Sequence, residues 1–222
     1  MNGIRGIAFL AFVAMCSTSI AHEVTMKRTE VDHTLADIAP HAEQLPLHFA
    51  SSQERMEIQT KLQKLLYFLD AAVLENPDET DLLLRDAIGN GFGHNMGCPD
   101  CGDKAIKAYE RLLQLQPENA FGNWRYGAFL AQTAQQEKSI PYLQKAQKLG
   151  IVEAHYTAAI VYISLNDLDR AKFELRQYVQ ANPKDKRAKG FLADMEHGNL
   201  HIHVHDGPPP PDAAPAPTNP ET

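Results

Sequence analysis

Two prolines, Pro117 and Pro183, each close a comparable stretch of helical periodicity and lie 66 residues apart, the length of two units of about 33 residues. A repeat of that length is typical of stacked helical hairpins. Each hairpin in such a stack buries its apolar side against its neighbours, and the stack as a whole presents a groove. The pattern therefore predicts an all-α solenoid, and binding is its first expected role.

Apolar residues recur at helical spacing through most of the chain. A capping box, Ser51 with Glu54, precedes the first strong segment. The region 22–52 is weakly patterned and is expected to form at best a short helix, whereas 53–198 is expected to be one helical domain. Gly89 to Gly93 is expected to break the helix before it. The predicted helices span 51–75, 79–88, 104–116, 120–132, 139–150, 153–165, 168–181 and 186–197.

Small residues recur within these helices where two helices would approach closely. Aromatic residues and prolines accompany them at regular places. The positions that carry the pattern are Ala105, Tyr109 and Pro117, then Gly127, Ser139 and Ala146, then Ala154, Ala159, Tyr162, Ala171 and Pro183, and finally Ala188 and Ala193. In this spacing the chain resembles the tetratricopeptide repeat, specifically over 104–196 and more weakly over 53–102. Tyr178 and Ile151 depart from the family pattern, and the unit from Pro77 to Pro117 is longer than usual. The resemblance implies about three repeats, the best over 104–183, and a C-terminal capping helix.

The resemblance also implies where a partner would bind, because the first helix of each hairpin lines the concave face in this family. The residues that would face this groove are Phe121, Trp124, Ala128 and Gln132 in one repeat, and Glu153, Tyr156, Ile160 and Ser164 in the next. Trp124 and Tyr156 would be the main contacts for a protein or peptide. The alternative is that these two aromatic residues pack between helices.

Cys98 and Cys101 form the sharpest local motif, and three interpretations remain open. They can form a structural disulfide, bind a metal together with His94, or exchange thiols and disulfides at the start of a helix. A zinc site would need a fourth ligand, and the chain contains no second CxxC.

A second metal candidate lies near the C-terminus, where His201, His203 and His205 alternate along the chain. In an extended segment these imidazoles would share one face and could bind zinc or copper. The remainder of 199–222 is rich in proline and alanine and is expected to be disordered. No cofactor is required by the main hypothesis. The alternative function is an exported metal-handling or redox accessory protein that uses the two cysteines and this tail.

The first 21 residues resemble a cleaved signal peptide, with Arg5 followed by a short apolar run and small residues before the cleavage point. We therefore expect export, to the periplasm in a bacterium, with lipid attachment at Cys16 as the alternative. No later segment reaches membrane-spanning length.

Charge and the absence of a catalytic motif restrict the function further. The chain without its first 21 residues has 20 basic and 28 acidic residues, a formal charge of −8, which argues against nucleic acid as a partner. No nucleophile, base and orienting group occur in a recognisable arrangement, so enzymatic activity is not expected.

Overall fold

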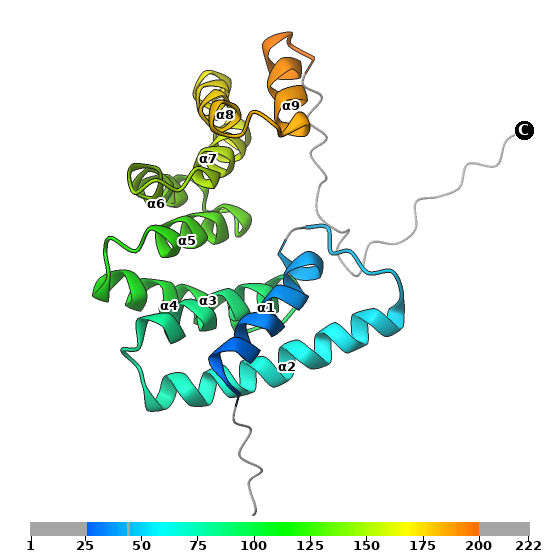
Figure 1. Ribbon diagram of the computed structural model, residues 1–222, viewed down its shortest axis with the longest axis vertical. Helices are drawn as coiled ribbons and strands as arrows, with labels where there is room; N and C mark the ends of the chain where they lie inside the picture. The colour runs from blue at the N-terminus through cyan, green and yellow to red at the C-terminus, as the bar shows by residue number, and fades with distance from the viewer. Residues whose placement is uncertain (1–25, 44, 200–222) are drawn as a thin grey trace, which may run out of the picture.

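The computed structural model describes residues 26–43 and 45–199, which form nine α-helices and no strand. The helices are α1 (Arg28–Ala42), α2 (Ser52–Glu75), α3 (Thr80–Asn95), α4 (Cys101–Leu115), α5 (Ala120–Gln132), α6 (Gln136–Lys148), α7 (Glu153–Ser164), α8 (Leu168–Ala181) and α9 (Lys186–Glu196). Figure 1 shows them stacked into an elongated helical array. The predicted all-α solenoid is confirmed.

Three regular hairpins form the body of the stack. Within them α3 pairs with α4, α5 with α6, and α7 with α8, while α9 packs on α8 as the predicted terminal helix. The first helices also contact one another from hairpin to hairpin, because α5 touches both α3 and α7. These three helices therefore lie along one side of the array (Figure 1).

The closest approaches between helices occur at small residues. A Cβ added to Gly127 of α5 would lie 2.8 Å from the Cγ atom of Leu143 in α6. Ala87 in α3, Ala159 in α7 and Ala171 in α8 are fully buried. The spacing that suggested the repeat is therefore the spacing of the helix contacts, since larger side chains would separate the helices.

Side-chain caps fix several of the predicted boundaries. Asn119 accepts a hydrogen bond from the Gly122 N–H at 2.8 Å, and Asp167 accepts one from the Arg170 N–H at 3.0 Å. Such caps satisfy backbone donors that have no partner within the helix. The helices that follow, α5 and α8, begin and end at the predicted residues.

The prediction that 22–52 is weakly structured is wrong for α1, which is a 15-residue helix. Its buried residues, Val31, Leu35, Ile38 and Ala42, recur at helical spacing and pack against α2 and α3. Pro40 lies in the last turn and donates no hydrogen bond to the Ala36 carbonyl, but the helix continues two residues further to Ala42.

The prediction that Gly89 to Gly93 breaks a helix is also wrong, because α3 continues through these residues to Asn95. Two of the three glycines allow a close contact: a Cβ on Gly89 would lie 3.2 Å from Leu69, and one on Gly93 would lie 2.7 Å from the Sγ atom of Cys101. Part of the unusual length of this repeat is therefore extra helix and not an enlarged turn.

Two other helices begin three residues earlier than predicted. Helix α4 begins at Cys101 and not at residue 104, and α6 begins at Gln136 and not at Ser139. Ser139 is buried within α6, where its hydroxyl donates to the Gln136 carbonyl at 2.6 Å. Serine hydroxyls readily form such hydrogen bonds with nearby backbone groups, which also makes serine common at helix starts.

The Gly127 contact predicts that Gly127→Ala destabilises the protein by about 1–3 kcal/mol, because the added methyl group would overlap Leu143. The matched control is Gly190→Ala in α9, where an added Cβ meets nothing within 4 Å. That change should stabilise the protein by about 0.5–1 kcal/mol through the higher helix propensity of alanine. Urea denaturation monitored by circular dichroism measures both, and equal effects at the two sites would contradict the close-approach interpretation.

Candidate peptide-binding groove

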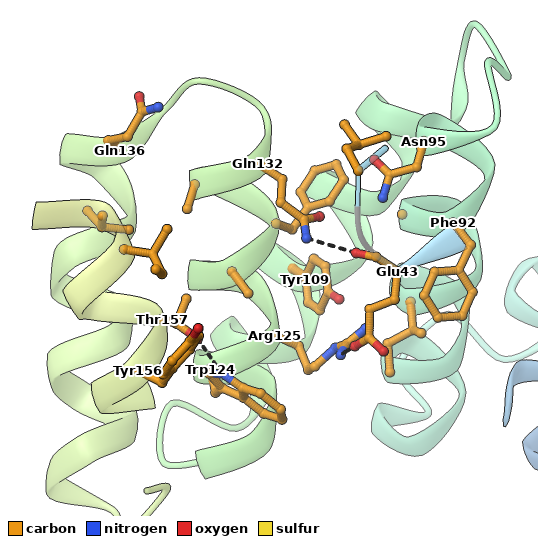
Figure 2. Close-up of a pocket in the computed structure, with 18 of the residues that line it drawn as sticks. Glu43, Phe92, Asn95, Tyr109, Trp124, Arg125, Gln132, Gln136, Tyr156 and Thr157 are labelled. Atoms are coloured by element: carbon orange, nitrogen blue, oxygen red, sulfur yellow. Dashed lines mark hydrogen bonds and ion pairs between the residues drawn. The ribbon is translucent and has the colours of Figure 1, made fainter. Parts of the chain in front are cut away.

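A groove of about 580 Å³ runs across the first helices of the three hairpins (Figure 2). Helix α5 forms its floor, α3 one wall and α7 the other. Its lining is mainly apolar and aromatic, with amide and hydroxyl groups between. The lining residues are Glu43, Leu45, Ile88, Gly91, Phe92, Asn95, Tyr109, Trp124, Arg125, Ala128, Phe129, Ala131, Gln132, Gln136, Tyr156, Thr157, Ile160, Val161 and Ser164.

Most of the predicted groove residues line this cavity. These are Trp124, Ala128, Gln132, Tyr156, Ile160 and Ser164. Phe121 and Glu153 do not line it and are exposed near the starts of α5 and α7. They lie one turn before Trp124 and Tyr156, so the predicted row of groove residues extends past the end of the cavity.

Trp124 combines the two roles that the sequence left open. Its indole Nε1–H donates to the Thr157 hydroxyl at 3.1 Å, and its ring meets Phe121 edge to face with centroids 5.3 Å apart. It also packs against the buried cluster formed by α6 to α9. Trp124 therefore joins α5 to α7 and presents part of its surface to the groove, as Figure 2 shows.

Tyr156 and Ile160 are the more accessible of the apolar groups that α3, α5 and α7 contribute to the groove. Tyr156 is 38% exposed and Ile160 is 43% exposed, and they lie one turn apart on α7. The Tyr156 ring also contacts Tyr178 of α8, with centroids 5.1 Å apart. Exposed apolar side chains beside a concave surface are typical of protein interaction sites.

Several groove residues were not predicted. Ile88, Phe92 and Asn95 come from α3, whose C-terminal half was expected to be a loop. Ile88 and Phe92 precede Ala128 and Gln132 by the same 40 residues that separate Pro77 from Pro117, so a continuous α3 would have revealed these two. Glu43 and Leu45 come from the segment after α1, and no periodicity links them to α5.

The Arg125 guanidinium is the single basic group among the described residues that line the groove. Its side chain is 15% exposed, and it forms an ion pair with the carboxylate of Glu43. Burial opposes the charge of Arg125, but Tyr109 and Glu43 outweigh this and raise the pKa of the guanidinium above its usual value. Burial also raises the pKa of the Tyr109 phenol to about 12. Arg125 is therefore a cation and Tyr109 is neutral at physiological pH.

Cys98 and Cys101 are joined by a disulfide, so neither sulfur is a free thiolate ligand. Cys101 is the first residue of α4 and is buried, and its sulfur lies against Gly93 of α3. The ring of His94 lies against Gly102 and meets Phe129 edge to face. The disulfide thus fastens the α3–α4 turn.

Among the described residues no three His, Cys, Asp or Glu side chains are placed to hold one metal ion. The proposed zinc or copper ligands His201, His203 and His205 lie outside the described residues. None of the helices within 26–43 and 45–199 has both the length and the apolarity that crossing a bilayer requires.

One buried acid lies away from the groove. Asp86 of α3 is 6% exposed and accepts a hydrogen bond from the Asn90 side chain at 2.9 Å. Burial and the nearby charge of Asp70 raise the pKa of Asp86 to about 7, although Lys104 acts in the opposite direction. The carboxyl group is therefore protonated in the folded state over a wide acidic range.

Comparison with known proteins agrees with this architecture. Residues 152–185, which contain α7 and α8, match the tetratricopeptide repeat family. A crystal structure of MamA superposes with a TM-score of 0.56 at 16% identity, covering 68% of this chain and 86% of that one. TTC0263, a thermophilic tetratricopeptide-repeat protein of Thermus thermophilus, gives a TM-score of 0.55 at 14% identity, covering 76% and 92%. No curated protein matches the chain in sequence.

Residues 152–185 are therefore a tetratricopeptide repeat, and the described residues share the fold of a tetratricopeptide-repeat protein. Repeat stacks of this kind act mainly as scaffolds for interaction with other proteins. The low identities to MamA and TTC0263 show a shared fold and do not transfer a partner to this chain.

The pKa of Asp86 predicts a pH-dependent effect of Asp86→Asn. Because the folded-state pKa of about 7 lies above the ordinary value of 3.8, this carboxyl's contribution to stability is lost as the pH rises through 7. Asn cannot ionise, so the variant should gain roughly 2–3 kcal/mol over the wild type between pH 5 and pH 8.

Urea denaturation at the two pH values measures this difference. The control is Asp194→Asn in α9, the same substitution at an exposed acid. A difference that does not change with pH for Asp86→Asn would show that the Asp86 carboxyl is already ionised at pH 5.

Proposed function

We propose that this protein is an interaction scaffold that binds a peptide segment of a partner protein in the groove of α3, α5 and α7. The observation that carries the proposal is the row of accessible apolar groups beside one continuous cavity, above all Tyr156 and Ile160. Elongated grooves between helices suit an extended or helical segment, since side chains along the segment can contact successive helices.

The polar groups of the groove support the same function. Asn95, Gln132 and Gln136 carry amides, which can donate to and accept from a peptide backbone. They lie between apolar surfaces, an arrangement in which apolar contacts provide affinity and a few hydrogen bonds fix orientation.

We further propose that the protein is exported, as its first residues suggested. Residues 1–25 lie outside the described residues. The Cys98–Cys101 disulfide supports the proposal, because disulfides persist in oxidising compartments and are rare in the cytosol.

Site-specific photo-crosslinking tests the groove directly. A photoreactive amino acid at position 160, in the groove, should crosslink a partner in the native host. The matched position is Phe173 on α8, which is 56% exposed and does not line the groove. Ile160→Glu should reduce capture of the same partner at least tenfold, because it places a charge in an apolar contact.

Phe173→Glu is the matched variant and should leave capture unchanged. Circular dichroism confirms that both variants fold, which is expected because both residues are exposed. Equal crosslinking from positions 160 and 173, or a partner that Ile160→Glu retains in full, would place the binding surface outside the groove.

A further inference from the structure

The chain itself enters the groove. After α1 ends, the Glu43 carboxylate pairs with Arg125, and the Glu43 carbonyl accepts a hydrogen bond from Gln132 Nε2 at 2.9 Å. Figure 2 shows Arg125 and Gln132 of α5 pointing toward this residue. Asn95 of α3 donates to the Ala42 carbonyl at 2.8 Å, and the Leu45 side chain lines the same cavity.

These contacts resemble those that a bound peptide would make. Two groove amides bind backbone carbonyls, Arg125 binds an acidic side chain, and an apolar side chain follows two residues later. Because Arg125 is mostly buried, removing its carboxylate partner costs free energy, and this point of the groove favours a carboxylate.

The segment is held more weakly than the helix that precedes it. Helix α1 is fixed by buried apolar residues, among them Val31, Leu35 and Ile38. Past α1 the contacts with the groove are weaker: Glu43 makes polar contacts and is 38% exposed at its side chain, and Leu45 is 60% exposed. Phe49 again packs against the apolar cluster that holds α1. Glu43 and Leu45 can therefore leave the groove while α1 and Phe49 stay in place.

We propose that Glu43 and Leu45, which follow α1, compete with the partner for the groove. The partner would displace them with its own acidic residue and an apolar residue two positions later. This inference rests on the proposed function and specifies the chemistry of the partner. The partner's carboxylate would take the place of Glu43 on Arg125, and its apolar side chain would take the place of Leu45. Because Glu43 is tethered, its effective concentration is high and it lowers the apparent affinity of any such partner.

The experiment uses the full chain and the fluorescence of Trp124, the only tryptophan of the sequence. The probe is a synthetic peptide with the sequence of residues 40–49, which contains no tryptophan. The matched peptide has glutamine in place of its one glutamate. Each peptide is titrated into the wild type, into Glu43→Gln, and into Glu43→Gln combined with Arg125→Gln, and melting curves confirm that each protein is folded.

The acidic peptide should bind Glu43→Gln at least about tenfold more tightly than the wild type, because the competing carboxylate is gone. The glutamine peptide should bind the Glu43→Gln protein about tenfold or more weakly than the acidic peptide does. Adding Arg125→Gln to Glu43→Gln should abolish this preference between the two peptides.

Three results would overturn the inference. Equal affinity of Glu43→Gln for both peptides would show that Arg125 does not select a carboxylate, and equal affinity of wild type and Glu43→Gln for the acidic peptide would show that Glu43 does not compete. A concentration-dependent dimer in sedimentation that Glu43→Gln abolishes would assign the segment to the groove of a second copy. If position 160 still crosslinks a partner in these cases, the proposed function survives and only the partner's chemistry changes.

Discussion

Close approach between paired helices is the constraint on which the rest of the structure depends. Where α5 meets α6, Gly127 leaves room for the Leu143 side chain, and a methyl group in its place would overlap that side chain. Ala159 and Ala171 are fully buried where α7 meets α8. Tight pairs of this kind can stack regularly, which places α3, α5 and α7 side by side and forms the groove between their exposed faces.

The groove residues also contribute to the stability of the stack. Trp124 donates to Thr157 of the next repeat, and Tyr156 contacts Tyr178 of its own hairpin. Tryptophan and tyrosine side chains can both stabilise the stack and contact a partner, because each has two ring faces and a polar atom. Ile160 is more exposed than either aromatic residue. A substitution at Ile160 should therefore affect binding with less effect on stability.

The first repeat differs from the others because two unusual features meet there. Helix α3 runs longer than α5 and α7, and its glycines allow Leu69 and the sulfur of Cys101 to approach its backbone. The disulfide fastens the turn that follows. On the groove side of this repeat, the segment after α1 contributes Glu43, so the electrostatics of the groove depend on a residue 82 positions from Arg125 in the sequence.

Periodicity predicted the helical class and the repeat, because both follow from spacing within one helix or between equivalent helices. The caps Asn119 and Asp167 fix where α5 and α8 begin. The resemblance to the tetratricopeptide repeat assigned Trp124, Ala128, Tyr156 and Ile160 to one groove. Only the tertiary structure shows that residues 89–93 continue the helix. A glycine allows both a helix break and a close helix contact, and the neighbouring side chains distinguish the two. The tertiary structure also decided the pairing of Glu43 with Arg125. A salt bridge between segments far apart in the chain leaves no periodic pattern in the sequence, since it depends on where the whole stack brings those segments together.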